Sequence, residues 1–127
     1  MELQDIFNKA SAHLSAMSGP CMRNRSCVYR DGKGGMCAVG VLIEDTYYSE
    51  DLEGNSVSNP DVTIAVAQSL DQDFLSSDQI LLLRRLQNVH DDWEYSAWSC
   101  ETNLQAMVRM LRKVAVDFEL SSLEVRL

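Results

Sequence analysis

Residues 27–43 constrain the fold more than any other segment of this 127-residue chain. They contain a dense run of turn-forming residues, Asp31-Gly32-Lys33-Gly34-Gly35, between positions that are compatible with strands. This pattern predicts a β-hairpin over residues 26–38, with a bulge because the turn is longer than two residues. The same glycines do not fit a phosphate-binding loop, because their spacing differs and the final Lys-Ser/Thr pair is absent.

An uncharged apolar run from Cys37 to Ile43 follows this turn. Periodicity alone does not distinguish a buried strand from a short buried helix here, and we favour a short helix that begins near Cys37. Two small residues in the run, Ala38 and Gly40, predict close packing against the backbone of another element.

Helical periodicity organises most of the remaining chain. Apolar residues recur at three- and four-residue intervals, and capping or helix-ending residues bound these stretches. Helices are therefore expected at residues 3–17, from Asn59-Pro60 to about Leu70, from Ser76 or Ser77 to about His90, and from about Ser99 to Phe118. Residues 44–59 are expected to form a surface loop, and residues 123–127 alternate in a way that fits an edge strand. The predicted fold is α+β and mostly α, with about five helices packed around a small β-hairpin in a single compact domain, residues 1–127.

The net charge of −8 is concentrated in the middle of the chain. Between Lys33 and Arg84 there is no basic residue, whereas this stretch contains Glu44, Asp45, Glu50, Asp51, Glu53, Asp61, Asp71, Asp73 and Asp78. Such a surface disfavours direct binding of nucleic acid and favours a partner protein with a basic surface. All of these residues except Asp78 are candidate binding residues. The alternative is that acidic loops serve only to keep the protein soluble.

Cys37 is the candidate nucleophile of a thiol enzyme. A thiol at the start of a helix experiences the helix dipole, which lowers the pKa of the thiol. His90 is the candidate base, and Asp91 the candidate residue that orients it, in a Cys-His-Asp arrangement. The alternative is that Cys37, between Met36 and Ala38, packs as a small apolar side chain. We favour packing, and with it a binding protein over an enzyme, while the thiol enzyme is kept as an alternative.

Neither a metal nor a cofactor is expected. The spacing of Cys21, Cys27, Cys37 and Cys100 does not match a zinc ribbon, and without an export signal the thiols are expected to be reduced. The group His90, Asp91, Asp92 and Glu94 offers possible ligands, but the only other histidine is His13. A cap at the end of a helix explains His90 without a metal.

Three aromatic residues, Trp93, Tyr95 and Trp98, cluster just after the helix that is expected to end near His90. Two tryptophans there fit either a ligand platform or the closure of the core, and both are candidate binding residues. Arg30 is a candidate for recognising a phosphate. Together with Arg109, these residues define an alternative function, a binder that sequesters a nucleotide.

The ordered motifs of the chain resemble a group of small uncharacterised proteins of tailed phages and prophages. The motifs are Cys27-x-Tyr29-Arg30, Gly35-x-Cys37-Ala38-Val39-Gly40-x-Leu42-Ile43-x-Asp45, Tyr48, Glu53-Gly54, and Leu86-Gln87-x-x-His90-Asp91 followed by Trp98. The resemblance covers roughly residues 3–111. It implies a phage accessory gene without an established activity, so it assigns no catalytic residue. The chain departs from the group at Met36, where relatives have a basic residue, and at Glu44, where they have proline.

These observations lead to one expected function. The chain is expected to be a phage-encoded accessory protein that inhibits or modulates a host protein, such as a component of a defence system, through its acidic surface. No segment approaches the ~18 apolar residues that cross a membrane, and residues 1–17 do not read as a secretory signal, so the cytoplasm of the bacterial host is the expected location. A homodimer is left open. The alternatives are the thiol enzyme and the nucleotide binder described above.

Overall fold

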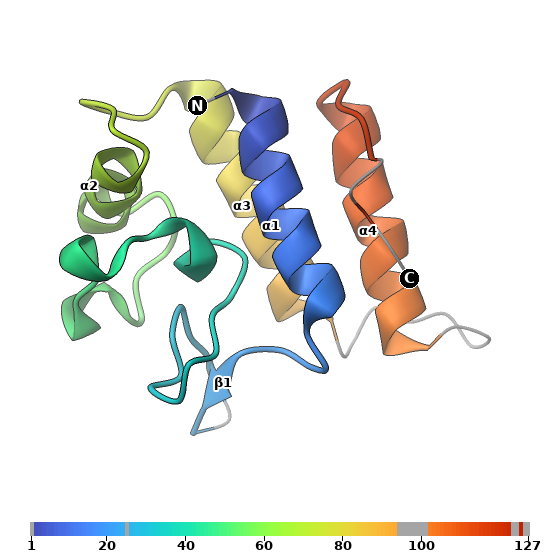
Figure 1. Ribbon diagram of the computed structural model, residues 1–127, viewed down its shortest axis with the longest axis horizontal. Helices are drawn as coiled ribbons and strands as arrows, with labels where there is room; N and C mark the ends of the chain where they lie inside the picture. The colour runs from blue at the N-terminus through green and yellow to red at the C-terminus, as the bar shows by residue number, and fades with distance from the viewer. Residues whose placement is uncertain (1, 25, 94–101, 123–124, 126–127) are drawn as a thin grey trace.

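In the computed structural model, which describes residues 2–24, 26–93, 102–122 and 125, the protein is α+β and mostly helical (Figure 1). Its α-helices are α1 (Leu3–Ala16), α2 (Pro60–Ser69), α3 (Ser77–Asp91) and α4 (Asn103–Asp117). Two short strands, β1 (Met22–Arg23) and β2 (Ser26–Cys27), pair in antiparallel orientation, and three 3-10 helices follow: η1 (Gly40–Leu42), η2 (Asp45–Tyr47) and η3 (Glu50–Leu52). The expectation of about five helices is corrected to four α-helices within the described residues, because the segment near Cys37 forms only the short η1.

Local capping explains where the helices begin. Of the two predicted caps of α3, Ser76 is the N-cap and bonds reciprocally with Gln79. Asn59-Pro60 opens α2 as predicted, and the Asn59 side chain accepts a hydrogen bond from the Asp61 N–H. The start of the last helix was expected near Ser99, which lies outside the described residues. Within them α4 begins at Asn103, where the N-cap Thr102 forms a capping box with Gln105.

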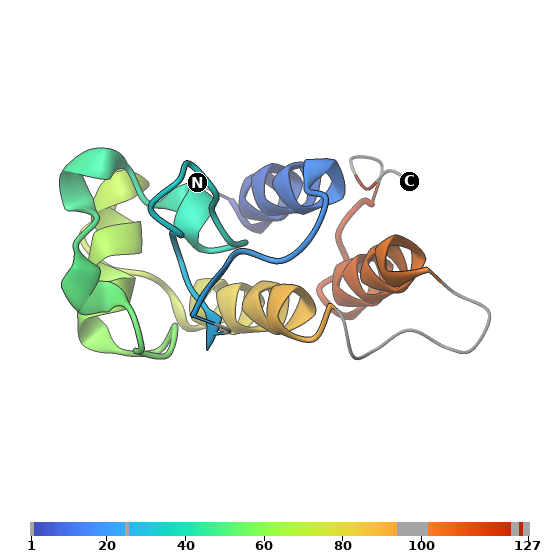
Figure 2. The same cartoon turned by 90° about the horizontal axis from the view of Figure 1, so that it is seen from below.

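Helices α1, α3 and α4 pack against one another and supply most of the core (Figures 1 and 2). Their apolar faces contribute the fully buried side chains Ile6, Phe7, Leu14, Leu82, Leu83, Leu86, Met107 and Leu111. Helix α2 and the 3-10 helices η2 and η3 lie at the end of the molecule away from α4 in both views. No described helix has the length and apolar character that a membrane span requires.

The hairpin expected over residues 26–38 is largely wrong. The paired strands lie earlier, with Met22 opposite Cys27, and only the isolated bridge between Arg30 and Met36 joins the two sides of the predicted hairpin. The Tyr29 N–H, which a longer hairpin would pair with the Cys37 carbonyl, instead donates to the Glu53 carboxylate at 2.9 Å, while the Cys37 carbonyl accepts the Val41 N–H at 3.1 Å. Glu53 also accepts the Arg30 N–H at 3.1 Å, so a side chain from a distant segment satisfies this part of the backbone.

Close packing at Gly40 is confirmed. A Cβ at this position would overlap the carbonyl group of Tyr29, 2.9 Å from its carbon. The surface loop expected at residues 44–59 is only partly correct, because the segment contains η2 and η3 and buries Leu52 and Val57. The edge strand expected at residues 123–127 lies outside the described residues except for Val125, which is buried.

Candidate functional site

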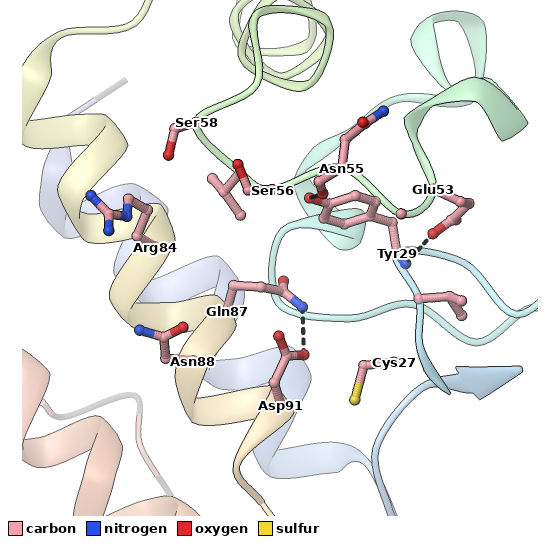
Figure 3. A pocket seen from close by; sticks show the side chains of 13 residues that line it. Cys27, Tyr29, Glu53, Asn55, Ser56, Ser58, Arg84, Gln87, Asn88 and Asp91 are labelled. Atoms are coloured by element: carbon pink, nitrogen blue, oxygen red, sulfur yellow. Dashed lines mark hydrogen bonds between the residues drawn. The ribbon is translucent and has the colours of Figure 1, made fainter. Parts of the chain in front are cut away.

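A cavity of about 510 Å³ opens between α3 and two loops, residues 27–29 and 53–58 (Figure 3). Helix α3 contributes a polar stripe, Arg84, Gln87, Asn88 and Asp91, whose spacing of three, four and seven residues places all four on one face. The opposite wall carries Asn55 and the hydroxyl-bearing residues Ser56 and Ser58. The volume falls within the roughly 300–1,000 Å³ that is typical of small-molecule sites.

Gln87 connects this cavity to the core. Its side-chain oxygen accepts hydrogen bonds from the Cys37 thiol (3.0 Å) and from the Val39 N–H (3.3 Å). Its amide nitrogen donates to Oδ1 of Asp91 at 2.9 Å. Because the Val39 N–H can only donate, it identifies which end of the Gln87 amide is the oxygen. Gln87 thus joins the segment after the turn to α3.

His90 is completely buried behind the cavity, and both of its ring nitrogens have partners. Nε2 accepts the Cys21 N–H at 2.7 Å, and Nδ1 lies 2.9 Å from Oδ1 of Asp91. A backbone N–H can only donate, so Nε2 carries no proton and Nδ1–H donates to Asp91. His90 is therefore neutral and fixed in one tautomer.

These contacts correct the predicted Cys37–His90 pair. Asp91 does bond to His90, as predicted, but His90 directs its other nitrogen at the backbone of Cys21. The Cys37 thiol instead donates to Gln87, and burial raises its pKa from 9.0 to about 12, against the opposing effect of the N–H groups of Gly40 and Val39. The predicted lowering of the pKa is therefore wrong, because burial outweighs the backbone donors. Cys37 packs in the core as the alternative prediction held.

The raised pKa of Cys37 predicts a loss of stability in alkali. The folded protein holds this proton more tightly than the unfolded chain, so the contribution is complete below pH 9.0 and disappears as the pH rises towards about 12. Within this window one such group lowers the free energy of unfolding by about 1.4 kcal/mol per pH unit. Urea unfolding at a series of alkaline pH values, for the wild type and for Cys37→Ala, measures the effect. The wild type should lose stability more steeply; two parallel pH profiles would contradict the prediction.

Cys27, His90 and Asp91 bring three possible metal-ligand atoms within 4.8 Å of one another. The donor set nevertheless does not fit a metal. Coordination through Nδ1 would move the ring proton to Nε2, where it would face the Cys21 N–H at 2.7 Å. Two ligands would then remain, fewer than protein sites for Zn²⁺ use. Of the other predicted ligands, Asp92 is exposed and Glu94 lies outside the described residues.

The structure separates the predicted acidic residues into two sets. Three have internal partners: Asp45 pairs with Arg30 at 2.7 Å, Glu50 pairs with Arg23 at 2.8 Å, and Glu53 holds two backbone N–H groups and the Tyr48 hydroxyl. The other five are exposed and form no ion pair with any described residue; they are Glu44, Asp51, Asp61, Asp71 and Asp73. Asp78, at the start of α3, is likewise exposed.

Two other predicted binding residues, Arg30 and Trp93, make contacts within the protein that leave little of their side chains accessible to a ligand. The Arg30 side chain is only 15% exposed, bonds to Asp45 and lies 4.5 Å from the centre of the Tyr48 ring, so a phosphate cannot use it freely. Trp93 is 3% exposed and belongs to the core, as the packing alternative held. Tyr95 and Trp98 lie outside the described residues.

Sequence reasoning missed the cavity itself. Its α3 side was visible in principle, because the polar stripe that begins at Arg84 alternates around the helix with the apolar face of Leu82, Leu83, Leu86 and Val89. Its other wall was not, since the seryl residues of the 53–58 segment carry no signal of which helix they face. The exposed thiol of Cys27 also lines this cavity.

Known proteins add little to this picture. No protein-family model, curated protein or solved structure matches the chain. The resemblance to phage and prophage proteins rests on the quoted motifs and remains a prediction.

Proposed function

We propose that this protein is a phage-encoded accessory protein that binds a host protein and inhibits or modulates it through an acidic surface. One observation carries the proposal: five exposed acidic residues that form no ion pair with any described residue lie in the segments from Glu44 to Asp73, which end at an exposed aromatic side chain, Phe74. We name this surface the acidic end and define it as Glu44, Asp51, Asp61, Asp71, Asp73 and Phe74. The phage setting is supported by the sequence resemblance alone.

The charge of the acidic end is concentrated in space as well as in sequence. The segments that carry it, from η2 through η3 to α2 and the loop that follows α2, lie away from α4 in both views of the molecule (Figures 1 and 2). No Lys or Arg occurs from residue 34 to residue 83, and within the described residues the arginines that reach this region, Arg23 and Arg30, pair with Glu50 and Asp45. A concentrated negative potential attracts a basic partner and accelerates its association.

Phe74 gives the acidic end an apolar surface that a partner can bury. Its side chain is 77% exposed, in the loop between α2 and α3 and next to Asp73. An exposed aromatic ring next to acidic residues fits the composition of an interface hot spot, because apolar burial supplies affinity while charged residues at the rim supply orientation and specificity. The outward position of Ile64 on α2, 53% exposed, adds a second apolar side chain to this end.

Capture from the lysate of the bacterial host tests the proposal. The wild type should retain a stoichiometric protein at low salt and release it as salt rises, since screening weakens contacts between exposed charges. Phe74→Ala should reduce the affinity roughly tenfold or more, the usual effect of removing a hot-spot residue. The combination Asp71→Asn with Asp73→Asn should mainly slow association and flatten the salt dependence.

Matched variants at the other end of the molecule serve as controls. Val116 on α4 is 71% exposed, so Val116→Ala removes a comparable apolar side chain without touching the acidic end. Asp92→Asn with Glu119→Gln removes two exposed charges elsewhere. Failure to retain any protein at low salt, or equal losses in the control variants, would contradict the proposal.

A further inference from the structure

We propose that the cavity beside α3 binds a small molecule that carries an oxyanion at one end and a hydrogen-bond donor at the other, such as a nucleoside monophosphate whose base bears an amino group. This site is separate from the acidic end. Three observations support it: the residues that line the cavity, the lack of described partners at Arg84 and at Oδ2 of Asp91, and the distance between Arg84 and Asp91 along α3.

Arg84 provides the anion-binding group. It is exposed, lines the cavity, and forms no ion pair or hydrogen bond with any residue in the described part of the chain. Elsewhere on the same helix Arg85 is paired, with Asp117 at 2.8 Å, so an unpaired arginine is a distinguishing feature of this face. A guanidinium binds phosphate and carboxylate oxygens in a bidentate manner. Next to it, Asn88 on α3 and Ser58 on the facing loop add neutral hydrogen-bonding groups (Figure 3).

Asp91 provides the hydrogen-bond acceptor at the other end of the cavity. Its Oδ1 already accepts hydrogen bonds from the Gln87 amide and the His90 ring, while no described group donates to its Oδ2. The carboxylate is 40% exposed and lines the same cavity. Because Gln87 and His90 hold it in place, Asp91 can present Oδ2 to a ligand without losing rotamer freedom on binding. An amino or imino group of the ligand is the complementary partner.

The separation of the two groups decides the class of ligand. Arg84 and Asp91 are seven residues apart, which is about 10 Å along a helix that rises 1.5 Å per residue. An α-amino acid holds its amine and carboxylate too close together to reach both. A nucleoside monophosphate has its phosphate and the amino group of its base at opposite ends, and the cavity of about 510 Å³ is of the size that such ligands use.

The other carboxylate of the cavity does not prevent this. Glu53 already accepts hydrogen bonds from two backbone N–H groups and from the Tyr48 hydroxyl at 2.6 Å, so both of its oxygens are engaged within the fold. The net charge of −8 opposes unspecific binding of anions. Binding of a phosphate group to this protein would therefore depend on the local donors around Arg84.

Calorimetric titration of the full chain tests the site with AMP, CMP and GMP as probes, and with ribose 5-phosphate, inorganic phosphate and free arginine as comparison ligands. AMP, CMP or GMP should bind saturably, and roughly tenfold more tightly than ribose 5-phosphate or inorganic phosphate, because the latter two lack a base that donates a hydrogen bond to Asp91. Arginine, which also has a cationic end far from its carboxylate, tests the other source of this chemistry. Binding of arginine with no binding of any nucleotide would overturn the assignment to a nucleotide.

Two arginine variants locate the site. Arg84→Gln should weaken nucleotide binding roughly tenfold or more, while Arg112→Gln, an exposed arginine on α4, should leave it unchanged. Because Arg84 has no described partner, its replacement should leave the urea unfolding midpoint unchanged, which separates loss of binding from loss of fold. Saturable binding that survives Arg84→Gln, or no saturable binding of any probe, would overturn the proposal.

Discussion

Replacing Gly40 with alanine is expected to lower the free energy of unfolding by about 3 kcal/mol or more. The added Cβ would overlap the carbonyl of Tyr29, and that carbonyl accepts the Cys37 N–H at 3.0 Å. Relief therefore requires the backbone at Tyr29 to move, and with it the hydrogen bond that holds the start of the apolar segment. Overpacking against backbone is costly because, unlike a side chain, the backbone has no alternative rotamer.

Urea unfolding of Gly40→Ala and Gly19→Ala measures this effect with a matched control. A Cβ at Gly19 would meet no atom within 4 Å, and the φ angle there is not in the left-handed region. Gly19→Ala should therefore be neutral or stabilise the fold by about 0.4–1 kcal/mol through the unfolded chain. Equal effects of the two substitutions would show that the contact at Gly40 is relieved without cost.

The elements that the sequence predicted correctly are those determined by neighbouring residues. The N-caps at Asn59 and Ser76 act over two or three positions, so α2 and α3 begin where local chemistry places them. The apolar spacing of α1 likewise predicts its buried face. The close approach at Gly40 was predictable for a related reason, since a glycine within an apolar run is typical of a place where another backbone comes near.

The elements that were predicted wrongly depend on contacts between distant residues. The hairpin does not extend beyond Arg30 and Met36, and there Glu53, more than 20 positions away, accepts the Tyr29 N–H that a longer hairpin would pair. The Cys37–His90 pair fails because Gln87, 50 positions from Cys37, accepts the thiol, and because the Cys21 N–H, 69 positions from His90, occupies the imidazole. Periodicity and capping do not encode such pairings, so sequence reasoning recognised the reactive residue types but paired them wrongly.

The candidate site shows the same division. Charge is a property of composition, and the base-free stretch from residue 34 to residue 83 remains the basis of the proposed acidic end. Which acids are paired is a property of the fold: Asp45 and Glu50 pair with arginines, while Asp71 and Asp73 form no ion pair with any residue that the structure describes. The exposure of Phe74 was not predicted, because only the structure shows that its ring lies outside the core.

Replacing Gln87 with leucine is expected to lower the free energy of unfolding by about 2–3 kcal/mol. The two side chains are similar in size, but leucine cannot accept the Val39 N–H and the Cys37 thiol or donate to Asp91. The Val39 N–H would then be buried without a partner, and leaving such a group unsatisfied costs more than the net value of the hydrogen bond. Gln68→Leu, at an exposed position on α2, is the matched control and should change stability by no more than about 0.5 kcal/mol.

Gln87→Glu keeps the size of the side chain and its acceptor oxygens, and so tests the hydrogen bond to Asp91 separately. An ionised glutamate keeps two acceptor oxygens for Val39 and Cys37, but it places a second carboxylate against Asp91, where the glutamine amide donates at 2.9 Å. Like charges at this distance repel, so this variant should be destabilised at neutral pH. Protonation restores a donor towards Asp91, so the difference from the wild type should shrink as the pH falls. If the difference between Gln87→Glu and the wild type were independent of pH, the bond to Asp91 would contribute nothing to stability, and the network would be held by packing instead.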